Sequence, residues 1–309
     1  MRTESLRLIQ SSSLRRNSID ALSLFVLPLT AAVLPRRVSF ALMKRVARNE
    51  RLYRASVEPA WQAARQYLPG LDEVTFRYRY RLLRLVDQVD TWLTLLRSAR
   101  WWSGQVDVDG VWPDTSGPFL LLTYHWGAGG FIWKLLRQRG IAAHFLARRA
   151  SYADMGLGRV ALWYARFREW AIVRIGCAGP IFLGGSKSRI RAAFAAGNSV
   201  MGMLDLPADA DGAAFTKPCE GWQMRFPRGL VDLSVESGLS VVLISAGLDR
   251  DNGRRNLRVE ALPPGIGADE IAARYAAHFA QRLADQPEYW QLWQVAPALF
   301  KPDSQERSG

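Results

Sequence analysis

Cysteine and histidine are scarce in this chain of 309 residues, which contains two of the first and three of the second. Two cysteines, Cys177 and Cys219, cannot build a disulfide framework, and we expect buried or incidental thiols in a reducing compartment. The three histidines form no metal-binding pattern, so no metal is predicted. The sequence also has no internal repeat and no low-complexity linker, which excludes a repeat architecture.

Long apolar runs are missing as well. No stretch reaches the roughly 18–20 apolar residues of a membrane-spanning helix. The nearest candidate, residues 21–35, is short, contains Pro28 and lies between basic flanks. It lacks the small-residue cleavage site of a signal peptide. We interpret residues 15–48 as an interfacial or shallowly inserted segment on an anionic membrane surface; the alternative is an ordinary apolar helix packed on the domain.

The charge of the chain is strongly one-sided. The net charge is +13 and the isoelectric point is near 10.3, which implies an anionic partner such as a nucleic acid, a membrane surface or an acidic substrate. Twelve tryptophans suit a lipid interface better than a plain nucleic-acid binder. Since no nucleic-acid recognition motif is present, we expect no nucleic-acid partner.

Four segments are predicted. Residues 1–18 form a flexible basic tail, 19–105 a helical lead-in with the interfacial anchor, 106–300 an α/β domain, and 301–309 a second tail. Within the lead-in, Asp72 is placed to cap a long helix whose apolar residues recur at helical spacing. These residues are Phe76, Tyr80, Leu83, Val86, Val89, Leu93 and Leu96.

From Val106 onward, short apolar runs alternate with helix-like segments. This pattern predicts an α/β fold with a mixed, largely parallel sheet covered by helices on both faces. Gly140, Gly197 and Gly238 each stand where a helix should end. The strands are expected in the runs VDVDG, FLLLTYH, AAHFLAR, AIVRI, SVMGMLDL, GWQMRF, VVLISAGL and NLRVEAL.

His125 follows the apolar run FLLLTY and precedes three glycines, Gly127, Gly129 and Gly130. In a parallel sheet, ligands bind beyond the carboxyl ends of the strands. A histidine there could take a proton from a hydroxyl or amine, or could be a structural residue at a strand end. His144 and His278 are expected to be structural.

The stretch VDVDGVWPDTSGPFLLLTYHWGAGGF resembles the entry to the active site in the late acyltransferases of lipid A biosynthesis, within the lysophospholipid acyltransferase superfamily. In that family an apolar strand leads into His-x-Gly-Asn-Trp-Glu. The likeness continues in order through AAHFLARRA, SKSRIRAAFAAGNSVMGMLDLPAD, FPRGLVDLSVESGLSVVLISA and QPEYWQLW. It covers about residues 50–295 and the short basic, apolar N-terminal anchor.

The resemblance implies transfer of a fatty acyl group from an acyl carrier protein or coenzyme A thioester to a hydroxyl of an anionic lipid or glycolipid. It implies no cofactor beyond this co-substrate, and a place on the cytoplasmic face of the bacterial inner membrane. His125 would be the general base, and an acid five positions later would orient its ring.

The sequence departs from the family at that acid, because Gly130 stands in its place. Another carboxylate could orient His125, with Asp205 at the end of a neighbouring predicted strand, Asp209 and Asp211 as candidates. A backbone carbonyl or water could also suffice. In the third reading the protein is a non-catalytic relative that binds lipid or acyl carrier.

Basic residues are expected to line the substrate site, where arginine can hold a phosphate through two bonds. The candidates are Arg148, Arg149, Lys187 and Arg228, and the amide of Gly127 is a candidate donor to the oxyanion. A hydrolase is disfavoured, since the Gly-x-Ser-x-Gly elbow is absent.

Overall fold

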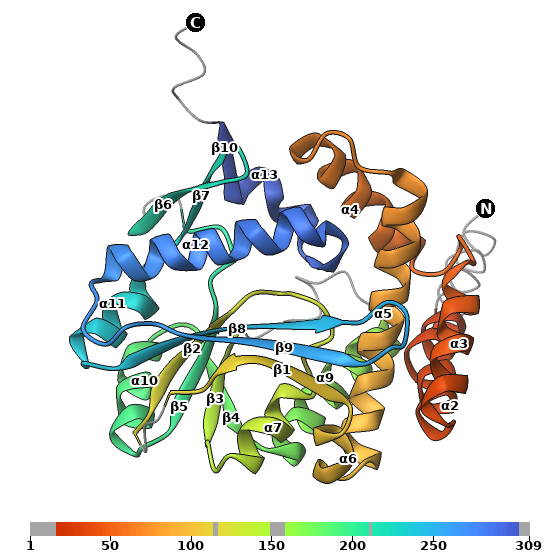
Figure 1. Ribbon diagram of the computed structural model, residues 1–309, viewed down its shortest axis with the longest axis horizontal. Helices are drawn as coiled ribbons and strands as arrows, with labels where there is room; N and C mark the ends of the chain where they lie inside the picture. The colour runs from red at the N-terminus through yellow and green to blue at the C-terminus, as the bar shows by residue number, and fades with distance from the viewer. Residues whose placement is uncertain (1–16, 114–116, 149–157, 210–211, 303–309) are drawn as a thin grey trace, which may run out of the picture.

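The computed structural model describes residues 17–113, 117–148, 158–209 and 212–302. It is an α/β fold with a mixed, largely parallel sheet of seven strands and a small second sheet of three strands (Figure 1). The strands of the large sheet are β1 (Val106–Val111), β2 (Phe119–Thr123), β3 (Ala143–Ala147), β4 (Cys177–Phe182), β5 (Ser199–Met203), β8 (Ser240–Leu248) and β9 (Arg255–Ala261).

The order of the large sheet is β1-β9-β8-β2-β5-β3-β4. Strands β8, β2, β5, β3 and β4 run parallel to one another, whereas β9 pairs antiparallel with β8 because only a short turn joins the two. Strand β1 pairs parallel with β9 at one edge. All five residues of β2 are buried, as expected for a strand in the middle of a sheet with both faces covered.

Helices lie on both faces of this sheet, with α12 above it and α7 and α9 below it in Figure 1. The helices of this domain are α7 (Ile132–Gln138), α9 (Arg159–Ile175), α10 (Ser186–Ala195), α11 (Gly229–Glu236), α12 (Ala268–Asp285) and α13 (Ala296–Leu299), with 3₁₀ turns η2 (Pro287–Tyr289) and η3 (Trp293–Val295). The predicted helix ends are confirmed: Gly140, Gly197 and Gly238 each have a positive φ.

Two expectations about strands were wrong. Residues 171–175, AIVRI, were expected as a strand but form the last turns of α9, and the strand is the following CAGPIF. Gly179 and Pro180 weaken the strand pattern of this segment. Proline is tolerated there because β4 is an edge strand. Lys301 and Pro302, expected in a tail, pair with β7 in the small sheet, whose strands are β6 (Ala214–Cys219), β7 (Trp222–Pro227) and β10 (Phe300–Pro302).

The N-terminal part is helical, as predicted, and α5 (Glu73–Leu96) is its main element. Its start is capped by Asp72, whose carboxylate accepts a bond of 2.7 Å from the Thr75 amide. The remaining elements are the π-helix η1 (Leu22–Val26), α2 (Leu27–Val33), α3 (Arg36–Ala47), α4 (Arg54–Tyr67) and α6 (Ala99–Ser103).

Ion pairs with two buried carboxylates join α5 to the α/β domain. The guanidinium of Arg255 on β9 donates to Asp90 at 2.8 Å, and that of Arg168 on α9 donates to Asp87 at 2.8 Å. Asp90 is fully buried, and one hydrophobic cluster runs through both parts of the chain. The lead-in therefore shares the core of the domain.

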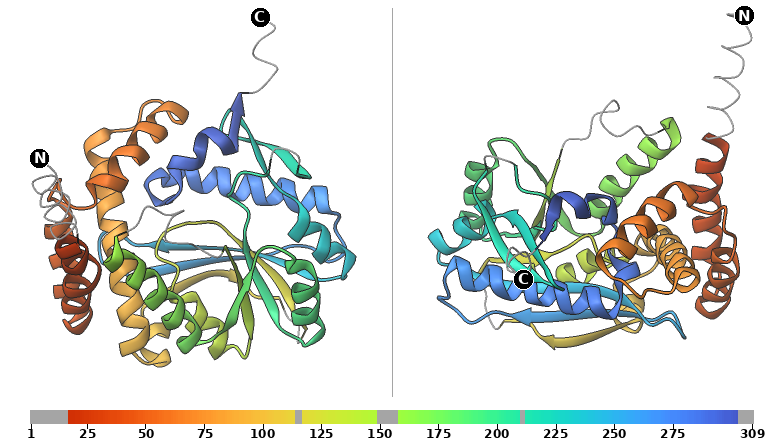
Figure 2. Two further views of the ribbon diagram at one scale, coloured as in Figure 1. Left: turned by 180° about the vertical axis from the view of Figure 1, so that it is seen from behind. Right: turned by 90° about the horizontal axis from the view of Figure 1, so that it is seen from above.

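Helix α2 packs against α5 through Ala31 and Ala32, which are fully buried, while the other side of this segment is exposed. Figure 2 shows these N-terminal helices at the same flank of the molecule as α9. Ring contacts join the two elements, since Phe25 lies 5.4 Å from Tyr164 and 6.0 Å from Phe167. In the part of the chain that the structure describes, no helix is long and apolar enough to cross a bilayer.

Candidate active site

The site is built where two neighbouring parallel strands end. Thr123 of β2 pairs in register with Met203 of β5, so the residues two positions further, His125 and Asp205, leave the sheet side by side. Nδ1 of His125 lies 3.0 Å from Oδ1 of Asp205. The sheet thus brings together two residues that are 80 positions apart in the sequence.

Three donors converge on the Asp205 carboxylate, which is completely buried. The His125 ring donates to Oδ1, and the His125 backbone N–H and the Trp290 indole N–H each donate to Oδ2 at 2.8 Å. A carboxylate can only accept, so the bond to Oδ1 fixes the neutral imidazole as the tautomer with its proton on Nδ1. The lone pair of Nε2 is then available as a base.

The pKa of His125 is raised above its ordinary value of 6.5 as the net result of opposing effects. Burial lowers the pKa, while the charge of Asp205 and the hydrogen bond to it raise the pKa by more. Asp205 therefore supports the imidazolium that forms when Nε2 accepts a proton. The His125 side chain is 30% exposed, so a substrate can reach it.

A C-terminal segment, residues 287–291, lies against the loop that carries His125. The Gln291 N–H donates to the His125 carbonyl at 2.8 Å, and Trp126 forms an isolated antiparallel bridge with Trp290. This segment is anchored by Glu288, whose buried carboxylate accepts from Arg250 at 2.5 Å. Nothing in the sequence QPEYWQLW indicates that the Trp290 indole would donate to Asp205.

Helix α5 supports the same loop from the other side. The Tyr80 hydroxyl donates to the Gln291 carbonyl at 3.3 Å, and Arg84 donates to the Gln291 side chain at 3.1 Å. The Gln291 amide in turn donates to the carbonyl of Gly127. The lead-in helix therefore helps to hold the histidine loop in place.

The expectation for Gly127 was wrong. Its N–H donates to the Tyr289 carbonyl at 2.9 Å and is not available to an oxyanion. Glycine is needed there for a different reason: φ is +61°, and a Cβ would lie 2.9 Å from the Ala246 carbonyl oxygen. Within the described part of the chain, the amides of Gly129 and Gly130 donate to no partner.

The other sequence candidates lie further from this pair. Arg148 follows β3 and Lys187 opens α10, both exposed at the carboxyl edge of the parallel strands. Arg228 binds Asp232 through two bonds of 2.7 and 3.0 Å and stacks on Phe215. None of these three side chains bonds to His125 or Asp205.

Two more candidates, Arg149 and Asp211, lie outside the described residues. Asp209 is exposed and makes no bond to His125 through its carboxylate. Of the two candidate acids that the structure describes, Asp205 and Asp209, it is Asp205 that contacts His125.

Neither of the remaining histidines bonds to His125. His144 contacts the Gly179 carbonyl at 3.1 Å, and His278 contacts the Tyr124 hydroxyl at 3.0 Å. Burial, with a smaller effect from neighbouring arginines, lowers the pKa of His278 to about 4, so it is neutral at physiological pH. Among the described residues, no group of three His, Cys, Asp or Glu side chains is placed to hold a metal ion.

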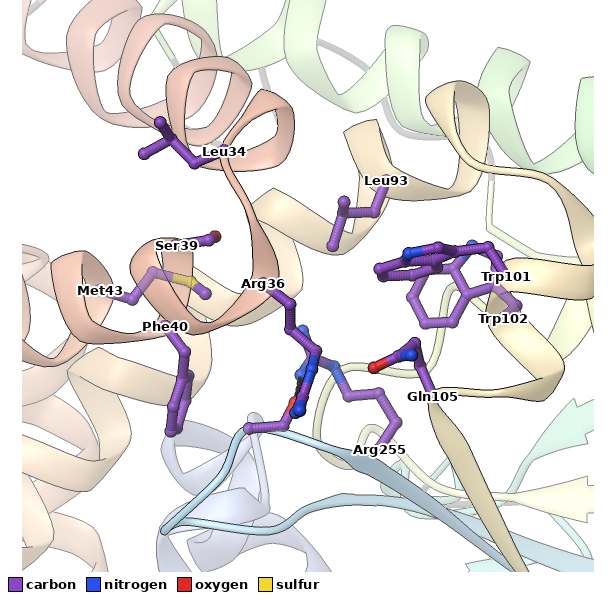
Figure 3. A pocket seen from close by; sticks show the side chains of 11 residues that line it. Leu34, Arg36, Ser39, Phe40, Met43, Leu93, Trp101, Trp102, Gln105 and Arg255 are labelled. Atoms are coloured by element: carbon purple, nitrogen blue, oxygen red, sulfur yellow. Dashed lines mark hydrogen bonds between the residues drawn. The ribbon is translucent and has the colours of Figure 1, made fainter.

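A small crevice lies between α3, α6 and the turn before β9 (Figure 3). Phe40 and Met43 stand on one side and Trp101 and Trp102 on the other. Its volume of about 20 Å³ has room for about one water molecule, and His125 is not among its lining residues.

A scan of the chain against models of known protein families finds no match, and a search of curated proteins finds none either.

Proposed function

We propose that this protein is a membrane-associated acyltransferase that moves a fatty acyl group from an acyl-carrier or coenzyme A thioester to a hydroxyl of a lipid or glycolipid. The observation that carries the proposal is the His125–Asp205 pair at the carboxyl end of β2, in which Nδ1 is bound and the His125 side chain is 30% exposed. The ordered resemblance to the late acyltransferases of lipid A biosynthesis supports the same reaction.

In the proposed reaction, Nε2 of His125 takes the proton of the acceptor hydroxyl. The hydroxyl oxygen attacks the thioester carbonyl, and a C–O bond forms. The C–S bond then breaks, and the thiolate leaves with the proton from Nε2. Asp205 keeps its charge throughout and stabilises the imidazolium, as the acid of a catalytic triad does.

Asp205 also offers a reason why Gly130 can replace the acid of the family motif. The Nδ1 side of His125 already faces a buried carboxylate that two further donors hold in place. A second acid would therefore not be needed to orient the ring, because Nδ1 already donates to Asp205.

For the location we propose the cytoplasmic face of the bacterial inner membrane, with residues 19–48 as a peripheral or shallow anchor. Support comes from exposed apolar residues at alternating spacings of three and four, which form one stripe on the N-terminal helix. Leu22, Val26 and Val33 are 58%, 54% and 59% exposed, and Ile19 and Leu29 continue the stripe.

The test is an acyl-transfer assay on membranes, with labelled acyl carrier protein thioester, a total lipid extract, and the protein or its His125→Ala variant. We expect a new acylated lipid with the parent protein and none with the variant, and its mass identifies the acceptor. His144→Ala is a matched control, since this histidine lies apart from the site. No transfer by a folded, membrane-bound parent would favour a non-catalytic lipid- or carrier-binding protein.

A further inference from the structure

A groove of about 660 Å³ lies at the opposite edge of the sheet from His125. Its walls are the C-terminal turns of α5, α7 and α9, and the last two lead directly into the starts of β3 and β4. The volume falls in the range of small-ligand sites. Nothing in the proposed acyl transfer uses it.

The lining of this groove contains three cations, Lys134, Arg137 and Arg174, and no carboxylate. Arg137 and Arg174 are exposed and make no ion pair with any described residue. Lys134 donates to the backbone carbonyl of Arg97. Burial lowers the pKa of Lys134, and the positive charge of Arg137 lowers this pKa further. The three cations thus lack a counter-charge.

An apolar surface begins at the rim of the groove. Trp170 lines the groove and is 56% exposed, and Trp163, two helical turns earlier on the same side of α9, is 67% exposed. Phe167 stacks on Trp170 at 5.9 Å and also contacts Phe25. These ring contacts connect Trp170 through Phe167 to Phe25, which belongs to the N-terminal helical segment that carries the exposed apolar stripe.

We propose that this groove binds the phosphate of an anionic phospholipid headgroup in the bilayer that the apolar surface contacts. Arginine side chains can hold a phosphate through two bonds, and lysine adds a point charge. Exposed tryptophans take positions at the level of the headgroups, which favours a lipid surface over an acidic protein as the partner. The proposal extends the membrane association proposed above and is independent of acyl transfer.

The experiment is a vesicle co-sedimentation assay with the full chain, using vesicles of phosphatidylcholine alone and of phosphatidylcholine mixed with phosphatidylglycerol. The test variant is Arg137→Gln/Arg174→Gln. Since a basic residue near an anionic membrane contributes a factor of about five, we expect about 30-fold weaker binding to the mixed vesicles. Binding to phosphatidylcholine alone should change little.

The matched control is Arg54→Gln/Arg65→Gln, which removes the same charge from α4 at the other end of the molecule (Figure 1). Equal losses in both double variants would mean that binding depends only on net charge, and would overturn the proposal. Unchanged vesicle binding in the test variant would also overturn the proposal. This holds even if the variant loses binding of inorganic phosphate or of acyl carrier protein, since the groove would then bind one of these and not a lipid headgroup.

A second variant, Trp170→Ser, should weaken binding to both kinds of vesicle, since it removes apolar rather than charged contact. A separate assay measures acyl transfer to an acceptor dispersed in detergent, where no bilayer is present, and so tests the proposed function independently of the groove. The groove variants should retain that activity, whereas His125→Ala should lack it.

Discussion

Replacement of Asp205 by asparagine tests the proposed mechanism most directly. The amide has one oxygen, and Oδ2 is the position to which two donors, the His125 backbone N–H and the Trp290 indole N–H, both donate at 2.8 Å. We expect the oxygen to occupy that position, which turns the NH₂ group toward Nδ1 of His125. Nδ1 must then accept, so the proton moves to Nε2 and the base is lost.

The expected loss of acyl transfer is about 10⁴-fold, the effect of the same change in a serine-protease triad. The effect on folding should be smaller. Each of the three bonds loses about 1 kcal/mol when its acceptor is no longer charged, so the free energy of unfolding falls by at most about 3 kcal/mol. Urea unfolding separates this loss of stability from the loss of activity.

The pH dependence gives a second readout. His125 must be neutral to act as a base, so the rate of the parent should rise with pH through its raised pKa. Asparagine removes the two effects that raise the pKa and leaves burial, which lowers it, so the acid limb of any residual activity should move to lower pH. The stability that the ion pair contributes should be full below pH 6.5 and lost as the pH rises through the raised pKa.

Asp209→Asn is the matched control, because it makes the same chemical change at an exposed acid four residues later. It should leave both activity and stability unchanged. A folded Asp205→Asn protein that retains activity within tenfold of the parent would refute the role assigned to Asp205.

Three further changes test other parts of the structure. Gly127→Ala should lower the free energy of unfolding in urea by about 1–3 kcal/mol, because φ is +61° and the new Cβ would lie 2.9 Å from a carbonyl oxygen; a neutral effect would contradict the strained loop. Gly130→Glu, where a Cβ would meet no atom within 4 Å, should leave acyl transfer within a few-fold of the parent, since Asp205 already bonds to Nδ1; a large gain would show that the motif acid is still needed. Arg255→Met should cost about 3–5 kcal/mol of stability, because it leaves the buried carboxylate of Asp90 unpaired, and a loss below about 1 kcal/mol in urea unfolding would count against that pair.

Much of the fold could be predicted because its signals are local. The alternation of apolar runs with helical patterns gave the α/β class, and the capping Asp72 and the helix-ending glycines gave several boundaries. The strand at residues 177–182 was missed because a glycine and Pro180 weaken its pattern, and only its place at the edge of the sheet makes them acceptable.

The candidate site was only partly predictable. His125 could be found because an apolar strand followed by glycines is a local pattern. Gly127 was given the wrong role, since the partner of its amide, the carbonyl of Tyr289, is 162 positions away in the chain. The contribution of Trp290 was missed for the same reason.

The sequence by itself determined the fold class, most of the strands and helices, and that a histidine stands at a strand end. Only the tertiary structure decided that β5 lies next to β2, which places Asp205 rather than Asp209 beside His125. It also gathered Arg137 and Arg174 from two helices into one groove. The physical reason is that local conformation depends on neighbouring residues, whereas strand order and helix packing depend on the burial of surfaces from the whole chain.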